Sequence, residues 1–201
     1  MTAALPMVAA SPAAATSAAS TRATVGIPAR AYAPYFETWT SRTVPAVAQA
    51  SGSRYFTLAF LQTPKPGSCT LAWNGDPHQT VRPGGAFVGQ VHRLQPRGGQ
   101  VIVSLGGESA DAAGTEIADS CPSVAKTAAA YEKVIATYGM TQLDMDVEGK
   151  SLFNRTGLAR RSAAIRQLED WAARTGRAVR VDLTVGIVPA GLPRSSRNVI
   201  A

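Results

Sequence analysis

The sequence predicts an α/β protein in which parallel strands alternate with helices. Short apolar and β-branched runs, such as 55–61 and 101–105, are typical of strands buried on both faces. Segments with apolar residues at helical spacing, such as 124–138, lie between such runs. Strands and helices that alternate through short connections form βαβ units. This alternation fits either an open doubly wound sheet or a (β/α)8 barrel, and periodicity alone does not separate the two.

The expected elements follow one another in a regular order. Strands are predicted at 31–36, 55–61, 101–105, 142–147 and 179–188, and helices at 43–50, 85–94, 124–138 and 158–173. The helix at 124–138 stops at Gly139, a residue that suits the left-handed cap of a helix C-terminus. The loop at 62–83 is rich in Pro, Gly and Asn, and a loop of that length in a compact domain is usually functional or disordered. About five βα units are therefore expected.

The bulk composition fits one globular domain. The chain has 201 residues, of which 45% are hydrophobic and 16% charged, and no apolar run approaches the ~20 residues of a transmembrane helix. The net charge is +7, but the basic residues are scattered. Their densest group, Arg155, Arg160, Arg161 and Arg166, fits a solvated helix face better than a nucleic-acid site, and no recognition motif accompanies it. We therefore expect neither a nucleic-acid nor a membrane partner.

Residues 1–26 differ from the remainder, 27–201, which we take as the folded domain. They consist largely of Ala, Ser, Thr and Pro, so we expect a disordered leader or the remnant of a secretory signal. The basic start of a signal peptide is missing, which leaves either an upstream start or a flexible arm. We expect a secreted, extracellular protein. In that setting Cys69 and Cys121, which both follow turn-like sequence just past predicted strands, are expected to form a disulfide rather than two separate thiols.

The segment 143–149 carries three acids in alternate positions. Side chains alternate along a strand, so Asp144, Asp146 and Glu148 point to one face, at intervals of ~6.6 Å. The intervening residues are apolar and suit a face that packs on helices. Several unpaired charges inside a core would each cost several kcal/mol, so these acids must share protons or bind a ligand. A solvated edge strand and a site for a hard cation are the alternatives.

Two motifs in this order resemble the family-18 glycoside hydrolases, the chitinases and endo-β-N-acetylglucosaminidases. Ser104-Leu105-Gly106-Gly107 ends one predicted strand, and Asp144-x-Asp146-x-Glu148 ends the next, forty residues on. The resemblance covers roughly 31–192 and is greatest to short bacterial chitinases. It implies a (β/α)8 barrel. This chain departs from the family pattern at Thr141 and Gln142, where the family has Asp and Gly.

The resemblance also implies a mechanism. Glu148 would be the general acid, and such an acid needs burial or neighbouring negative charges, here Asp146 and Asp144, to hold its proton. Catalysis in this family is assisted by the substrate, whose N-acetyl oxygen attacks the anomeric carbon. Asp146 would orient that acetamido group, and Asp144 would exchange a proton with Asp146. Ser104 would bond near Asp144 or simply cap the turn. The expected partner is chitin or an N-acetylglucosamine oligosaccharide, with no metal or organic cofactor.

Substrate contacts are expected from aromatic residues and glycines near the strand ends. Tyr35, Trp39 and Phe60 would stack on sugar rings, although Phe60 equally suits the core. Trp73, in the long loop, is a candidate platform at the rim. Gly106 and Gly107 would let the backbone approach a ligand or a neighbouring strand closely.

The barrel is expected to be incomplete. A full barrel has eight strands and typically ~250 residues, whereas about five strands are recognisable here. Family members supply a Tyr from the sixth strand and a Trp from the eighth, so we expect little activity from this chain alone and self-association through open barrel edges. A noncatalytic glycan-binding relative is the rival hypothesis, although such relatives usually lose the acid at the position of Glu148. An unrelated doubly wound binding domain is the third.

Overall fold

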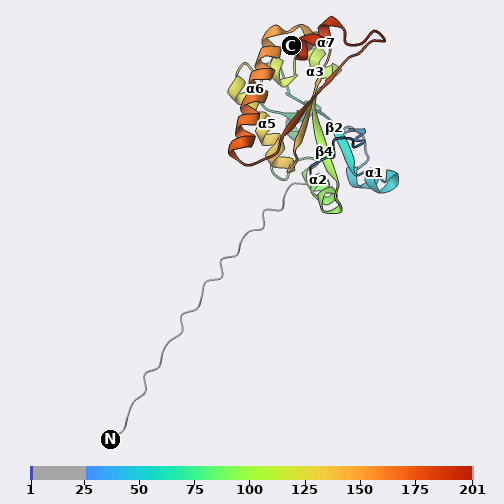
Figure 1. Ribbon diagram of the computed structural model, residues 1–201, viewed down its shortest axis with the longest axis vertical. Helices are drawn as coiled ribbons and strands as arrows, with labels where there is room; N and C mark the ends of the chain where they lie inside the picture. The colour runs from blue at the N-terminus through green and yellow to red at the C-terminus, as the bar shows by residue number, and fades with distance from the viewer. Residues whose placement is uncertain (2–25, 201) are drawn as a thin grey trace.

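The computed structural model describes Met1 and residues 26–200 (Figure 1). The leader expected at 1–26 lies outside the described residues, apart from its two ends. The strands are β1 Tyr35–Glu37, β2 Tyr55–Gln62, β3 Ala72–Trp73, β4 Gln100–Gly106, β5 Gln142–Val147 and β6 Arg180–Val185. The helices are α1 Val44–Ser51, α2 Val88–Leu94, α3 Glu108–Ala113, α4 Ile117–Ser120, α5 Val124–Tyr138, α6 Arg155–Arg174 and α7 Arg194–Ile200, with short 3₁₀ helices η1 Pro77–Gln79, η2 Gln95–Arg97 and η3 Gly149–Phe153.

Within the described residues, five parallel strands form one sheet in the order β1-β2-β4-β5-β6, and β3 pairs antiparallel with β2. All five expected strands are present. β1 begins at Tyr35, later than expected, because Pro34 has no N–H to donate to a strand ladder. Helices α3 and α4 were not expected, because six and four residues are too few to show a helical period, and α7 was not expected either.

Helices α1, α2, α5 and α6 form one layer on the same side of the sheet. α1 packs on α2, α2 on α5 and α5 on α6 (Figure 1). On the opposite, inner face the Tyr35 hydroxyl of β1 reaches Asp144 of β5 and lies 3.4 Å from Thr184 of β6. The two edge strands therefore approach each other across the inner face, so the sheet curves as in a barrel. A doubly wound sheet would instead carry helices on both faces.

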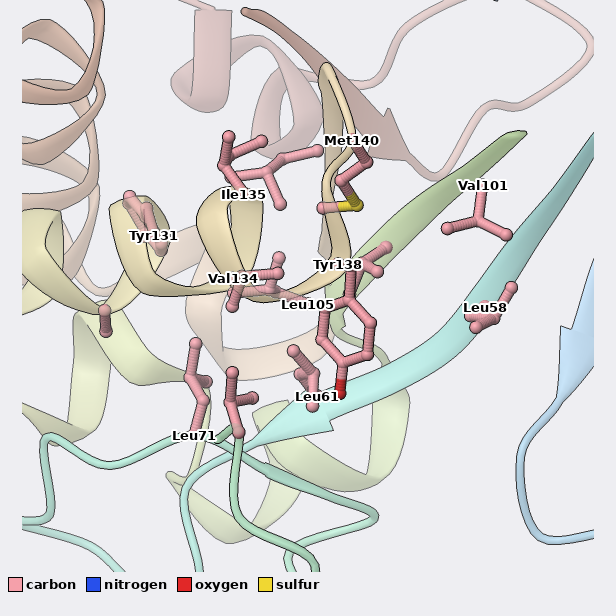
Figure 2. Packing of buried hydrophobic residues seen from close by; sticks show 14 of the residues in the cluster. Leu58, Leu61, Leu71, Val101, Leu105, Tyr131, Val134, Ile135, Tyr138 and Met140 are labelled. Carbon is pink, nitrogen blue, oxygen red and sulfur yellow. The ribbon is translucent and has the colours of Figure 1, made fainter. Parts of the chain in front are cut away.

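The apolar core lies between this helical layer and the outer face of the sheet. Leu105 of β4 and Val134, Ile135 and Tyr138 of α5 are completely buried together there (Figure 2). Because strand side chains alternate, packing every second residue into this core turns the intervening residues to the inner face. In the part of the chain that the structure describes, every helix is too short or too polar to cross a bilayer.

The prediction that Trp73 is an exposed platform at the rim is wrong. Trp73 is completely buried in β3, and its Nε1 donates to the Tyr138 hydroxyl at 2.8 Å. Its ring meets those of Phe87 and Tyr138 edge to face. β3 pairs with β2 and directs the indole into the core, where its N–H still finds an acceptor. The loop at 62–83 therefore contributes to the core through β3.

The loop after β2 is joined to α4 by a disulfide. Cys69 and Cys121, the pair expected from the sequence, are bonded with a Cα–Cα distance of 4.7 Å. Thr63 strengthens the same junction, since its N–H donates to the Thr115 carbonyl and its hydroxyl lies 2.8 Å from that of Ser120. The segments that follow β2 and β4 are therefore held together at the carboxyl end of the sheet.

Removing the disulfide should lower the free energy of unfolding by about 4 kcal/mol, because the bond closes a long loop. The two cysteines are separated by 52 residues. Urea unfolding of Cys69→Ala/Cys121→Ala beside the parent measures the difference, and the reduced parent should match the double variant. Equal stabilities, or two free thiols in the denatured, air-handled parent, would contradict this.

The outer edges of β1 and β6 should let copies of the chain associate. Among the described residues neither edge has a neighbouring strand, and Leu183 of β6 is 37% exposed. Open strand edges pair readily with other chains, and lysine on an edge opposes such pairing. Leu183→Lys should therefore lower the association measured by light scattering. A monodisperse monomer in the parent, or equal scattering from both proteins, would argue against association through β6.

Candidate active site

The three acids of the predicted row lie at the carboxyl end of β5. Asp144 and Asp146 are each 4% exposed, and Glu148, just past the strand, is half-buried. Leu143, Met145 and Val147 alternate with them and are buried in the apolar core. The alternation expected from the sequence is therefore the arrangement of β5.

Asp144 is held by hydroxyl groups from other strands. Its Oδ2 accepts from Ser104 of β4 at 2.6 Å and from Tyr35 of β1 at 3.0 Å, and its Oδ1 accepts from Thr184 of β6 at 2.8 Å. Burial raises the pKa of Asp144, whereas these hydrogen bonds oppose the rise. Asp182, paired with Asp144 across β5 and β6, raises the pKa further. The carboxyl group is thereby fixed in one orientation.

Asp146 differs from Asp144 because one of its oxygens has no protein partner. Within the described residues, its buried Oδ1 has no hydrogen bond. Burial raises the pKa of Asp146 to about 8, and the nearby charges of Glu148 and Asp144 act in the same direction. At neutral pH this carboxyl group keeps a proton. It can therefore both donate to and accept from a polar group of a ligand.

The main chain at Glu148 turns away from the strand. Its N–H donates to Oδ2 of Asp111 in α3. The next residue, Gly149, has a φ of +43°, in the left-handed region that favours glycine, and the chain then enters η3. The position of Glu148 thus depends on α3 as well as on β5.

Gly106 and Gly107 allow the end of β4 to pack closely against β5 and β2. A Cβ atom at Gly106 would lie 2.2 Å from the Asp146 carbonyl oxygen, and one at Gly107 would lie 3.1 Å from the ring of Phe60. The Gly107 N–H donates to that same Asp146 carbonyl at 3.0 Å. Both glycines are buried, so of the two expected contacts, with a ligand or with a neighbouring strand, the structure shows the second.

An open groove of about 550 Å³ lies beside β2 and α3. Trp39, which is 56% exposed, and Phe60 stack with a centroid distance of 6.4 Å along it. Its polar lining includes Asn74 and Glu108. The Glu108 carboxylate would lie 3.5 Å from a Cβ atom at Gly149, so the groove reaches the turn that follows Glu148.

Comparison with known proteins bears on this arrangement of acids. No protein-family model matches the chain. It is 28% identical over 189 residues to a probable bifunctional chitinase/lysozyme of Escherichia coli strain K12, a match that covers 90% of the chain and 20% of that relative. Among solved structures, active domain 2 of a chitinase from Pyrococcus furiosus matches at 26% identity and a TM-score of 0.62, over 80% of this chain and 48% of that one. The chain is thus similar to chitinases in sequence and in fold.

A family GH18 chitinase from Chromobacterium violaceum supports the fold alone, at 16% identity and a TM-score of 0.50, over 77% of this chain and 32% of that one. The fold of this chitinase relative is accordingly an incomplete (β/α)8 barrel, and the doubly wound alternative is wrong. The chain spans about a fifth of the curated relative and about half of the Pyrococcus chain.

The structure of this chitinase relative gathers most of the predicted site residues but changes some of their roles. The Tyr35 hydroxyl binds Asp144, so this residue supports the acids in addition to presenting a half-exposed ring. Ser104 is completely buried and donates to Asp144, so the expected hydrogen bond near that acid is confirmed and Ser104 supports the acid. Trp39 and Phe60 line the groove, as expected of sugar-stacking residues. In residues 26–200 no group of three or more His, Cys, Asp or Glu side chains is arranged to hold a metal.

Sequence reasoning missed Thr184 and Asp111. Thr184 had a usable signal, since Asp182 and Thr184 are alternate polar residues on a strand that follows the acid strand. Asp111 had none, because it lies in a helix of six residues. Gln142, which stands where the family motif has Gly, donates a side-chain hydrogen bond to Asp182 on β6.

Stability should fall as the pH rises from about 4 to about 8. The pKa of Asp146 is raised to about 8 in the folded chain, against ~3.9 when unfolded, so the folded chain keeps a proton that the unfolded chain loses. This contribution is complete below a pH of about 4 and is lost as the pH passes about 8. Asp146→Asn cannot lose that proton and should flatten the dependence, measured by urea unfolding across this range.

The exposed Asp170 of α6 provides a matched control, because Asp170→Asn should leave the pH dependence of the parent unchanged. The slope should diminish in Asp146→Asn without vanishing, since the pKa of Asp111 is raised to about 7, chiefly by burial, and contributes in the same range. Parallel curves for the parent and Asp146→Asn would show that Asp146 does not hold the proton.

Proposed function

We propose that this chain is the acid-bearing part of a glycoside hydrolase that cleaves β-1,4-linked N-acetylglucosamine by substrate-assisted, retaining catalysis. The observation that carries the proposal is the division between the two aspartates. Asp144 is fixed by hydroxyl groups, whereas Asp146 holds a proton at neutral pH and has a buried oxygen without a protein partner. The Asp146 carboxyl group can therefore bind an amide ligand, because it has both a proton to donate and a free oxygen to accept.

The comparisons support this substrate class. The Escherichia coli relative is named a chitinase/lysozyme, and the Pyrococcus furiosus domain has been solved in complex with chito-oligosaccharides. Chitin and the N-linked glycan core both contain the N-acetyl group that this mechanism needs. The stacked pair Trp39 and Phe60 favours extended sugar chains, since the two rings line an open groove of about 550 Å³ that reaches the turn after Glu148 through Glu108.

In the proposed mechanism, Glu148 donates its proton to the glycosidic oxygen as the bond to the anomeric carbon breaks. The acetamido oxygen of the same sugar attacks that carbon and forms an oxazolinium ion. Asp146 accepts the acetamido N–H and passes its own proton to Asp144, so that the Asp146 carboxylate stabilises the developing positive charge. Water then attacks the anomeric carbon and gives its proton to Glu148. The acid is restored, and the sugar retains its configuration.

We also propose that the protein is secreted. The disulfide between Cys69 and Cys121 supports it, because such bonds persist in oxidising compartments, and cell fractionation tests it.

The rival function is sugar binding without hydrolysis. The retained Glu148 and its hydrogen-bonded main chain favour the hydrolase.

In a chain extended to complete the barrel, Glu148→Gln should abolish hydrolysis and leave sugar binding intact. The amide keeps the shape of the side chain but has no proton to transfer, and general acid catalysis is worth ~10²–10⁴ in rate. Turnover of a fluorogenic chitobiose conjugate measures the first effect, and retention on chitin beads the second. Glu169→Gln, an exposed change on α6, is the matched control and should behave as the parent.

Trp39→Ala separates binding from chemistry in the same assay. Loss of its exposed ring should weaken retention on chitin about tenfold, or ~1.4 kcal/mol. Tyr32→Ala is its control, since Tyr32 is 79% exposed at the opposite, amino end of β1. Turnover by Glu148→Gln above about a hundredth of the parent rate would exclude Glu148 as the acid. Chitin binding without turnover in the extended parent would favour the rival function.

A further inference from the structure

A buried group of polar side chains lies behind Glu148, away from the groove. We call it the rear cluster, and its members come from elements that follow β4 and β5. They are Asp111 of α3, Glu116 and Asp119 at α4, Ser151 of η3 and Arg161 of α6. All except Asp119, which is half-buried, are at most 2% exposed. The proposed chemistry uses none of them directly.

Asp111 links this cluster to the proposed acid. Its Oδ2 accepts the main-chain N–H of Glu148, and its Oδ1 lies 2.9 Å from the Ser151 hydroxyl. Both oxygens are therefore occupied, and they hold residues on either side of Gly149. A Cβ atom at Gly149 would lie 3.9 Å from the Cβ of Asp111, so α3 packs directly on this turn. A change at Asp111 must reach Glu148 through these contacts.

Ser151 requires the cluster to hold a proton. Its hydroxyl lies within hydrogen-bond distance of both Asp111 and Asp119, but it has one hydrogen to donate. The other carboxyl group must therefore donate to the Ser151 oxygen, so the pair Asp111 and Asp119 carries one proton between them. With that proton in place, Ser151 joins the two acids without repulsion.

The positive charge of Arg161 does not neutralise the Asp111 and Asp119 pair in place of this proton. Its Nη2 pairs with Glu116 at 2.8 Å, and the same Glu116 oxygen also accepts the N–H groups of Ala118 and Asp119. The Arg161 charge is therefore matched by Glu116, and the Asp111 and Asp119 pair keeps one negative charge. Tyr131 of α5 also lies near Glu116 and Arg161.

We propose that Asp111 is a positioning residue for Glu148: its carboxylate, locked by Ser151 and Asp119, fixes the main chain of the acid from behind. The catalytic part of this role rests on the proposed function, whereas the structural part does not. General acid catalysis depends on the distance from the proton to the leaving oxygen, so a displaced main chain lowers the rate without altering sugar binding in the groove.

Asp111 also interacts electrostatically with the charged groups around it. It faces Asp146 of β5, Glu148 just past that strand, Glu116 at the start of α4 and Arg161 of α6, and it shares the Ser151 hydroxyl with Asp119. Burial raises the pKa of Asp111, while the hydrogen bonds from Glu148 and Ser151 lower it. Its charge in turn raises the pKa of Asp146. Asp111 therefore also helps Asp146 to keep its proton.

Two substitutions at Asp111 separate the hydrogen bond from the charge. Asp111→Asn keeps an oxygen that accepts the Glu148 N–H but removes the charge, and Asp111→Ala removes both. In the parent, the NMR resonance of the Glu148 amide proton should titrate with the Asp111 carboxyl group. That titration should disappear in both variants, whereas protection of the amide from hydrogen exchange should be lost in Asp111→Ala and retained in Asp111→Asn. Asp170→Asn is the control and should keep both.

The kinetic expectation is a fall in kcat of at least tenfold in Asp111→Ala with KM unchanged, and recovery of most of this loss in Asp111→Asn. An unaltered Glu148 titration in Asp111→Asn, or parental kcat in Asp111→Ala, would overturn the proposal. If the parent shows no turnover, the proposed function fails, yet the amide titration still decides the structural role. If Asp111→Ala does not fold, the titration in Asp111→Asn alone decides it.

Discussion

Asp144 can be buried on the inner face of the sheet because separate strands bring hydroxyl groups to it. Tyr35, Ser104 and Thr184 come from β1, β4 and β6, and they reach one carboxyl group only if the sheet curves. Curvature therefore places the whole set of inner-face residues. An extended flat sheet would separate the edge strands and leave the acid without its donors, at a cost of a few kcal/mol for a buried carboxylate.

The same curvature divides the molecule into two environments. Outward residues of the strands pack against the helical layer that includes α2, α5 and α6, while the inward residues include the acids and the hydroxyl groups that bind Asp144. β5 illustrates the division within six residues, since Leu143 and Met145 are core while Asp144 and Asp146 are not. The stability of the sheet and the chemistry of its inner face thus depend on different residues of the same strands.

The sequence predicted the long elements well and the short ones poorly. α5 and β5 have the predicted bounds because fifteen residues of helical period, or an alternating strand, leave little ambiguity. Trp73 was misplaced because two-residue strands such as β3 carry no period, and pairing with β2 decided its burial. The acid row was readable from β5 alone. The contacts of Asp144 with Thr184, and of Glu148 with Asp111, depend on how separate segments meet in space, which no local pattern reports.

The groups that hold Asp144 are uncharged, and this has a consequence for how the protein responds to ionic strength. Mobile ions screen charges on the surface over ~10 Å at 0.1 M salt but reach buried groups far less. The exposed arginines of α6, which contribute to the net charge of +7, are surface charges that salt screens. Asp144 and Asp146 are buried and are screened far less. Added salt will therefore suppress adsorption of this basic chain to anionic surfaces, while the proton affinities of its inner-face acids stay nearly constant.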